Sequence, residues 1–310
     1  MTIQQLNYVV ALDTHRHFVK AAESCFVAQP TLTLQVKKLE QELGLTLFDR
    51  SVQPLVPTPM GELFVLKARQ ILRDVNSLME LVKSEKNDLE GTFRLGVIPT
   101  LAPYLLPRFL KDFSDQHPKI RLEIRELTTE NILRGLKADT LDLGLLVTPV
   151  DENQLREIPL FYEPFWVFAS AENPLLSQET VAPDSLTTDG LWLLQQGHCF
   201  RNQVLNLCQQ NQLSPSESRF SFESGSIETL KNMVKSNLGY TLIPELSLQQ
   251  GDDQQYVRKF SDPQPAREVS LVVHSGFTKE LLIDHLRDTI LKHTPDHFRK
   301  NERFVRIKWR

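Results

Sequence analysis

Two cysteines in the segment GHCFRNQVLNLC, residues 197–208, have the clearest capacity for chemistry in this chain of 310 residues. Cys199 follows a Gly-His pair, Cys208 comes nine positions later, and the chain has three cysteines in total. Such a pair can be redox-active, can bind a metal, or can simply fill a hydrophobic core. A metal site is poorly supported, because the spacing is not Cys-x-x-Cys and only His198 lies nearby. Cys25 occupies an apolar helical position and is expected to be a core residue.

The surroundings of Cys199 indicate how its sulfur could be activated. Gly197 is expected to end one element, and Phe200 onward is expected to be helical, so the sulfur would lie near a helix N-terminus. Aligned backbone N–H groups favour negative charge there, and a thiol reacts as its thiolate. His198 and Arg201 could add positive charge or hydrogen bonds. The pattern therefore predicts a cysteine that deprotonates more readily than a free one.

The first 58 residues predict three short helices. Amphipathic patterns cover residues 3–12 and 17–26, and a third helix begins near Pro30 and ends at Gly44. A third helix that carries Thr, Gln and Lys is typical of a helix-turn-helix reader of the DNA major groove, with residues 47–59 as a wing. A plain helical bundle would give the same pattern, and the balance of five basic and five acidic residues does not decide between them. The candidate DNA contacts are Gln29, Pro30, Thr31, Thr33, Gln35, Lys37, Lys38 and Arg50.

A long helix is predicted from Met60 to about Lys86. Its apolar stripe has spacings of 4, 3, 4, 3 and 4, which is the pattern of a coiled-coil seam. Packing against its own chain is the alternative, but pairing with a second subunit is the simpler way to bury such a stripe. The expected dimerisation residues are Phe64, Ile71, Val75, Leu78 and Val82, with Ala68 on the same stripe.

From residue 91 the pattern alternates between strands and helices, which indicates an α/β fold with a parallel sheet. Strands are expected at 92–99, 120–127, 141–147, 165–170, 190–196, 239–244 and 268–275, with helices between them. No Gly-rich dinucleotide loop or Walker sequence is present, so no cofactor is expected.

Composition places the chain among globular proteins of the cytosol. The hydrophobic fraction of 41% and the charged fraction of 24% are ordinary, and no apolar run is long enough for a membrane helix. Neither a secretory signal nor a disulfide scaffold is evident, so a cytoplasmic location without membrane contact is expected. Residues 297–310 carry six Lys or Arg and one Glu, and are expected to be a solvated tail, with contact to nucleic acid or a partner subunit as the alternative.

Together these segments resemble the LysR-type family of bacterial transcriptional regulators over essentially the whole chain. The strongest matches are FVKAAESCFVAQPTLTLQVKKLEQELGLTLFDR near the N-terminus, and LDLGLLV and IPELS further on. The resemblance implies a winged helix-turn-helix domain, a linker helix, and a regulatory domain of two α/β subdomains built like a periplasmic binding protein. The corresponding ranges are 1–58, 59–90 and 91–300, with subdomain one at about 91–163 and 268–300, subdomain two at about 164–267, and a basic tail at 301–310.

Within that family, GHCFRNQVLNLC is similar to the sensing segment of the peroxide-responsive members. The resemblance makes Cys199 the thiol that peroxide oxidises and Cys208 the thiol that then forms a disulfide with it. It also assigns Thr100, Thr129 and Arg267 to a peroxide pocket, beside His198 and Arg201. Two positions depart from the family: Asn202 stands where an aspartate is common, and Gln53 stands where the wing often has a basic residue.

The implied disulfide conflicts with the predicted helix. Nine helical steps separate residues 199 and 208 by about 13 Å and put them on opposite faces. A disulfide requires α-carbons roughly 4.4–6.8 Å apart. Oxidation must therefore unwind this segment and repack its apolar residues.

The implied function is a peroxide-sensing activator of oxidative-stress genes that is not an enzyme. Promoter DNA, hydrogen peroxide as the signal, RNA polymerase and a cytosolic thiol reductant of the glutaredoxin or thioredoxin type are the expected partners, with a homodimer or homotetramer as the assembly. Three alternatives remain: a regulator that binds a small organic ligand between the subdomains, a thiol peroxidase built around Cys199, and a binding protein without DNA affinity.

Overall fold

The computed structural model describes residues 1–84, 89–187, 189–208, 224–249, 251–299 and 303–309, without the side chains at 76, 77 and 79–84. The chain divides into two compact units, residues 1–88 with 276–278 and residues 89–275 with 279–310. Within the described part, no helix combines the length and apolar character that crossing a membrane requires.

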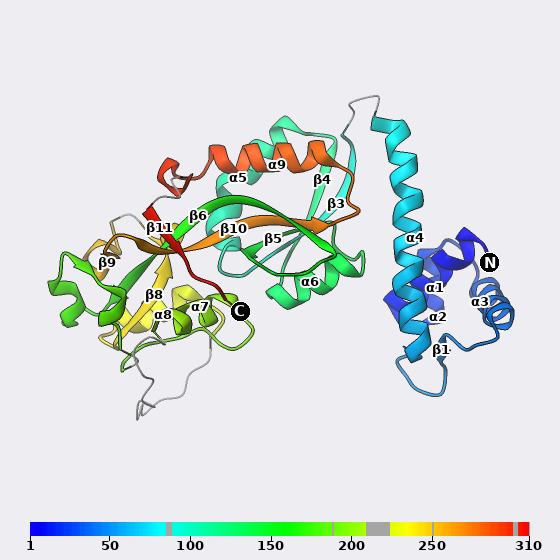
Figure 1. Ribbon diagram of the computed structural model, residues 1–310, viewed down its shortest axis with the longest axis horizontal. Coiled ribbons are helices and arrows are strands. Elements are labelled where there is room, and N and C mark those ends of the chain that lie inside the picture. Colours follow the sequence, from blue (N-terminus) through cyan, green and yellow to red (C-terminus); the bar gives the residue numbers. More distant parts are fainter. Residues whose placement is uncertain (85–88, 188, 209–223, 250, 300–302, 310) are drawn as a thin grey trace. The chain divides into compact units, whose positions relative to one another are not determined.

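The first unit is a small helical domain followed by a long helix (Figure 1). Its elements are α1 (Ile3–His15), α2 (Phe18–Ser24), α3 (Gln29–Leu43), the two-stranded antiparallel wing β1 (Phe48–Asp49) and β2 (Val56–Pro57), and α4 (Pro59–Ser84). Buried aliphatic residues of all three short helices form one core, which includes Leu12, Ala22 and Val36. The three helices and the wing have the arrangement that the resemblance implies.

Local sequence explains where these helices begin and end. Thr2 and Gln5 form a reciprocal capping box at the start of α1. Pro30 occupies the first turn of α3, where its missing N–H costs nothing, and Gly44 ends α3 with a φ of 68°. Gly61, in the first turn of α4, passes so close to the wing that a β-carbon would lie 1.9 Å from the Leu47 carbonyl oxygen. This close approach fixes the start of α4 against the wing.

The second unit is an α/β domain around one mixed sheet. The sheet order is β4-β3-β5-β10-β6-β9-β7, with β11 paired to β10 and β8 paired to β6. The strands are β3 (Gly91–Val97), β4 (Ile120–Glu126), β5 (Leu143–Thr148), β6 (Leu155–Ala169), β7 (Thr180–Val181), β8 (Tyr240–Pro244), β9 (Val257–Phe260), β10 (Gln264–His274) and β11 (Phe304–Arg306). Strands β3, β4 and β5 are parallel, and β5 is buried along its whole length, as expected for a central strand with both faces covered.

Two long antiparallel strands, β6 and β10, run through both lobes of this unit (Figure 1). The first lobe contains α5 (Ala102–Gln116), α6 (Thr129–Lys137) and α9 (Glu280–Lys292), and α5 and α9 lie side by side. The second lobe contains α7 (Cys199–Cys208) and α8 (Ile227–Lys235) around a core that includes Phe165, Phe200 and Leu230. The short helices are η1 (Pro174–Ser177), η2 (Pro183–Ser185), η3 (Glu245–Ser247), η4 (Gln254–Tyr256) and η5 (Asp296–Arg299).

The structure corrects two expectations. The segment 190–196 is not a strand, because only an isolated bridge joins Leu191 to Tyr240. Residues 303–309, the described part of the predicted tail, are not a free solvated segment either: β11 pairs in parallel with the start of β10, and Trp309 is only 6% exposed. Residues 300–302 and 310 lie outside the described residues. The Trp309 indole N–H donates to the Pro149 carbonyl at 2.9 Å. Arg306 and Lys308 stay exposed, so the segment docks through the Trp309 indole and its backbone hydrogen bonds without burying its charges.

Candidate functional site

Cys199 is the first residue of α7 and is almost completely buried. Gly197 enters the helix with a φ of 93°, a conformation that L-residues rarely adopt, and so turns the chain just before the cysteine. The backbone N–H groups of Cys199 and Phe200 hydrogen-bond to the sulfur and lower the pKa of the thiol. The sulfur thus lies at a helix N-terminus, as the sequence predicts.

Burial nevertheless raises the pKa of Cys199, and this effect exceeds every opposing one. The positive charge of Arg267 and the Thr129 hydroxyl lower the pKa, as do the two backbone N–H groups. The expectation of an easily deprotonated thiol is therefore wrong for this conformation, because loss of hydration disfavours the thiolate. Apart from the Cys199 sulfur, whose pKa it lowers through a hydrogen bond, the buried Thr129 hydroxyl has no hydrogen-bond partner among the described residues, so it can also bond to a small ligand beside the sulfur.

Arg267 organises the site from β10. Its guanidinium is fully buried, and its Nε donates to Glu163 Oε2 at 2.9 Å. Its Nη1 donates to the Thr100 hydroxyl at 2.8 Å and its Nη2 to the Thr100 carbonyl at 3.0 Å. The guanidinium carbon also lies 5.7 Å from the centre of the Phe200 ring. Arg267 therefore binds Thr100 and Glu163 directly and acts on the Cys199 sulfur through its charge.

Glu163 is the residue of this site that the sequence does not indicate. It lies on β6 directly opposite Arg267 on β10, and it is fully buried. Its second carboxylate oxygen accepts the Leu246 backbone N–H at 2.8 Å. The one sequence signal that Glu163 belongs to the site is that it is a single carboxylate within the otherwise apolar stretch FYEPFWVFA. Its partner, Arg267, lies 104 residues further along the chain.

His198 and Arg201 contribute less directly than expected. The Arg201 Nη1 donates to the Leu194 carbonyl at 2.9 Å, which ties α7 to the segment before it. His198 is buried, and burial lowers the pKa of its imidazole, so the ring is neutral near pH 7 and supplies no positive charge. Arg267 is therefore the cation that acts on the Cys199 sulfur.

Cys208 ends α7 inside the core of the second lobe. It is completely buried, and burial raises its pKa to about 11. Phe200, Val204 and Leu207 lie in the same core. All three cysteines are free thiols, and in one straight helix the two on α7 are about 13 Å apart.

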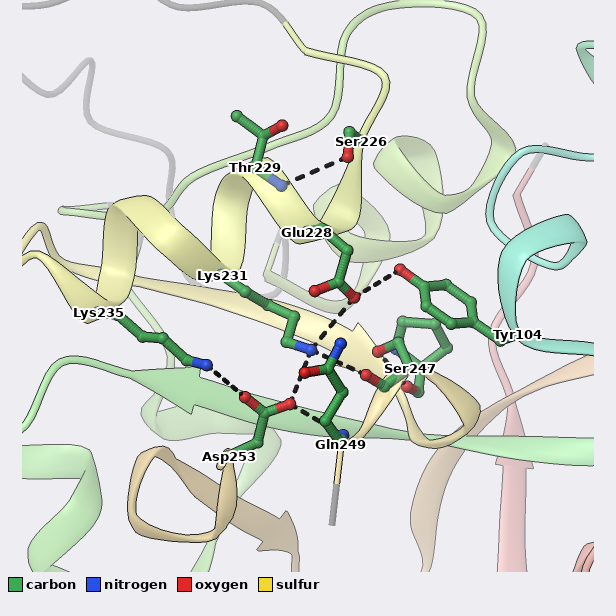
Figure 2. Close-up of polar contacts among 10 residues, drawn as sticks. Tyr104, Ser226, Glu228, Thr229, Lys231, Lys235, Ser247, Gln249 and Asp253 are labelled. Atoms are coloured by element: carbon green, nitrogen blue, oxygen red, sulfur yellow. Dashed lines mark hydrogen bonds and ion pairs between the residues drawn. The ribbon is translucent and has the colours of Figure 1, made fainter. Parts of the chain in front are cut away.

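A chain of polar contacts joins the two lobes beside this site (Figure 2). The Tyr104 hydroxyl on α5 donates to Glu228 on α8 at 3.0 Å, and Glu228 accepts from Lys231 at 3.2 Å. Lys231 is buried and pairs with Asp253 at 2.7 Å, and Asp253 also pairs with Lys235 at 2.8 Å. Burial and Glu228 both raise the pKa of Tyr104, so its hydroxyl stays a donor.

Seven of the candidate DNA contacts lie on α3, and the eighth, Arg50, follows β1 in the wing. Gln29, Pro30, Thr31, Lys37 and Lys38 are exposed, and Thr33 and Gln35 are half-buried. The side-chain oxygen Oε1 of Gln35 accepts a hydrogen bond from Gln5 Nε2 at 3.3 Å, and Arg50 pairs with Glu40 at 2.7 Å. Both side chains therefore hold the domain together as well as reaching its surface.

An exposed aromatic residue adjoins this surface and was missed by sequence reasoning. Phe26 lies in the turn before α3, has a φ of 56°, and is 96% exposed. The turn is held by the Phe26 N–H bond to the Glu23 carbonyl and by the Val27 N–H bond to the Ala22 carbonyl. Apolar side chains at this end of a recognition helix can contact thymine methyl groups.

The predicted seam on α4 divides into two parts. Ala68 is buried within the first unit, where the neighbouring Arg69 pairs with Asp13 of α1 at 2.9 Å. Ile71 and Leu78 are 39% and 67% exposed, whereas Phe64 and Val75 are half-buried. The side chain of Val82 lies outside the described residues. The exposed apolar positions leave a surface for a second subunit.

No metal centre is formed by the described residues, which contain no group of three or more His, Cys, Asp or Glu side chains placed to hold an ion.

Comparison with known families assigns both units. The family described as "LysR substrate binding domain" matches residues 86–295. The family described as "Bacterial regulatory helix-turn-helix protein, lysR family" matches residues 3–62. A relative named "Hydrogen peroxide-inducible genes activator" from Pectobacterium carotovorum subsp. carotovorum is 36% identical, over 94% of this chain and 97% of the relative. The "DNA-binding transcriptional dual regulator OxyR" of Escherichia coli K12 is 34% identical, over 97% and 98%.

Solved structures agree with this assignment. A full-length OxyR variant from Pseudomonas aeruginosa is 35% identical, with a TM-score of 0.81 over 95% of this chain and 99% of that one. An OxyR variant from Corynebacterium glutamicum with bound H2O2 is 26% identical, with a TM-score of 0.62 over 94% and 92%. The chain is therefore a member of the LysR family of bacterial transcriptional regulators.

Proposed function

We propose that this protein is a peroxide-sensing transcriptional regulator that is switched by oxidation of Cys199 and closure of a Cys199–Cys208 disulfide. One observation carries the proposal: a buried thiol at a helix N-terminus faces the charge of Arg267 and the otherwise unpartnered Thr129 hydroxyl, with a second thiol at the far end of the same helix. The relatives named for hydrogen peroxide induction favour this function over a response to a small organic ligand.

The first step is attack of the Cys199 sulfur on one peroxide oxygen. An S–O bond forms and the O–O bond breaks. The attacked oxygen keeps its hydrogen in the sulfenic acid, and the leaving oxygen, which keeps its own hydrogen, takes the thiol proton and departs as water. The sulfur is oxidised to sulfenic acid and the peroxide is reduced. Because burial keeps the thiol protonated at rest, the proton must leave during the reaction, and the Thr129 hydroxyl is placed to pass it on. The positive charge of Arg267 stabilises the negative charge that develops on the Cys199 sulfur as its proton leaves.

The second step is attack of Cys208 on the sulfenic sulfur. The S–S bond forms, the S–O bond breaks, and the hydroxyl leaves as water with the Cys208 proton. This step requires α7 to unwind, because its ends are about 13 Å apart and a disulfide allows roughly 4.4–6.8 Å between α-carbons. Phe200, Val204 and Leu207 must then leave their places in the core of the second lobe. The disulfide thus selects a second packing of that lobe.

We infer the output of the switch and its reset from membership of the family. The repacked regulatory domain changes how the DNA-binding units of a homodimer or homotetramer sit on promoter DNA, and activation implies contact with RNA polymerase. A thiol reductant of the glutaredoxin or thioredoxin type returns two electrons and two protons to the disulfide and is itself oxidised. The protein does not turn over peroxide as an enzyme, and it acts in the cytoplasm, where promoter DNA and this reductant are found.

Paired cysteine variants test the proposal. After limited peroxide treatment, the wild-type protein should contain the Cys199–Cys208 disulfide and show an altered promoter footprint. Cys199→Ser should show neither change, and Cys208→Ser should form sulfenic acid without the disulfide or the full change in footprint. A wild-type response in Cys199→Ser would exclude Cys199 as the sensor. Catalytic consumption of peroxide with a reductant, at rates far above the switching rate, would favour the thiol peroxidase instead.

A further inference from the structure

The C-terminal segment Phe304–Trp309 contacts the helix that must unwind. We propose that this segment braces α7 in the reduced protein and is released when the disulfide forms, with Gln203 and Asn206 as the positioning residues that couple the two events. The inference rests on the proposed function, because it describes how the same switch is held and set.

Two side chains of α7 hold the backbone of the segment directly. The Gln203 amide nitrogen donates to the Ile307 carbonyl at 2.7 Å, and the Asn206 amide nitrogen donates to the Lys308 carbonyl at 2.9 Å. Gln203 is completely buried, whereas Asn206 is exposed. Both donors lie between the two cysteines, so both are carried by the stretch of helix that the disulfide removes.

The other side of the segment is attached to the strand that carries Arg267. Phe304 and Arg306 lie opposite Gln264 and Ala266 in the parallel β11–β10 pairing, and the Ile307 N–H donates to the Ala266 carbonyl at 2.9 Å. Arg306 reaches Glu268 at 3.2 Å. These pairings flank Arg267 on both sides along β10.

Trp309 anchors the end of the segment in the first lobe. Its buried indole donates to the carbonyl of Pro149, which follows β5. The segment therefore crosses from the sensing helix to the opposite lobe, held at α7, β10 and the end of β5. Unwinding of α7 removes the attachment at α7. Once the helix is unwound, the side-chain amides of Gln203 and Asn206 no longer have the spacing that lets both bond to the Ile307 and Lys308 carbonyls.

The coupling has a direct consequence for the rates of the two chemical steps. Attack on peroxide occurs with α7 intact and does not involve the segment, so loosening the brace should leave sulfenic acid formation unchanged. Disulfide closure requires the two bonds to break, so loosening should accelerate it. One lost hydrogen bond corresponds to about a fivefold change in rate.

Hydrogen exchange followed by mass spectrometry tests the release. In the reduced protein the Ile307 amide should exchange slowly, and in the oxidised protein the peptide that contains it should exchange at least about tenfold faster, while α9 stays unchanged. Peroxide-treated Cys208→Ser should keep the slow exchange. Slow exchange in a sample whose peptide map contains the Cys199–Cys208 disulfide would overturn the proposal.

Substitutions test the brace. Asn206→Val removes the donor at equal helix propensity and should accelerate closure about fivefold without altering sulfenic acid formation. Lys308→Ala is the matched control, because the bond is accepted by the backbone carbonyl of Lys308, which this substitution keeps, and not by its side chain. Trp309→Ala should also accelerate closure, and its effect should combine with Asn206→Val less than multiplicatively. Unchanged closure in Asn206→Val would overturn the brace.

Hydrogen exchange of the reduced protein tests the brace independently of the proposed redox switch. If mapping finds no disulfide after peroxide, the redox switch fails. The brace is then judged by whether Asn206→Val alone raises exchange at Ile307 in the reduced protein; unchanged exchange there would overturn it as well.

Discussion

Replacing Arg267 should separate its role in folding from its role in peroxide chemistry. Arg267→Met removes the cation but leaves Glu163 fully buried without its partner. The double variant Arg267→Met with Glu163→Leu removes both charges from the same place. The two variants lose the same influence on Cys199 but differ in how much buried charge remains uncompensated.

The magnitudes follow from the contacts. Breaking one side of a buried ion pair costs roughly 3–5 kcal/mol, whereas replacing both partners by apolar residues is often close to neutral. The Thr100 hydroxyl and carbonyl lose Arg267 in both variants, so the only further loss in the double variant is the partner of the Leu246 N–H, which costs about 1–3 kcal/mol. We therefore expect the double variant to recover roughly 2 kcal/mol of the unfolding free energy that the single variant loses.

The peroxide reaction should respond differently. Arg267 lowers the pKa of Cys199, so its removal raises that pKa further and moves the rise of rate with pH to higher pH. A thiol pKa that is higher by about one lowers the thiolate fraction at neutral pH about tenfold. Both variants should therefore react more slowly with peroxide near neutral pH, by about tenfold for each unit by which the pKa of Cys199 rises. Urea denaturation and stopped-flow peroxide kinetics across neutral and alkaline pH measure the two effects. A double variant that reacts as fast as wild type would refute the role of Arg267.

Three further predictions concern other parts of the chain. Folding raises the pKa of Cys208 from 9.0 to about 11, so between these values the folded protein keeps the thiol proton and the unfolded chain loses it. The resulting contribution to stability is complete below pH 9 and is lost as pH rises toward 11. Denaturation of the reduced protein should show about 2 kcal/mol more loss over that window than Cys208→Ala does. Leu78→Asp should weaken self-association about tenfold or more in sedimentation experiments, while an unchanged mass would remove α4 from the interface. Phe26→Ala should weaken promoter binding about fivefold. Replacing thymine by uracil in the promoter should weaken binding of the wild type but not of the variant. Equal losses of affinity in both proteins would exclude contact between Phe26 and a thymine methyl group.

Local pattern predicted the elements well wherever neighbours in sequence determine them. The helix from Cys199 to Cys208 and the helix from Pro30 to Gly44 follow from apolar spacing and from capping residues, and the structure has both. The prediction of a strand at residues 190–196 was wrong because this apolar run packs in the core without pairing to another strand along its length.

The site required information that no local pattern contains. Glu163 and Arg267 meet only because β6 and β10 pair in one register, so a lone Glu in an apolar stretch gave no indication of its partner. The pKa of Cys199 depends on how deeply the fold buries the sulfur, and that burial outweighs the helix N-terminus.

The C-terminal segment shows a different failure. Its basic residues suggested solvent, and Arg306 and Lys308 are indeed exposed. The segment is held instead by the buried Trp309 and by backbone pairing with β10, about forty residues earlier in the chain, and no local pattern contains that partner.

The most direct test of the redox switch is promoter footprinting of peroxide-treated protein whose cysteine linkages are mapped in the same sample. We expect the footprint to change in proportion to the fraction of Cys199–Cys208 disulfide, and a thiol reductant to reverse both. A full disulfide with the footprint of the reduced protein would contradict the proposed switch.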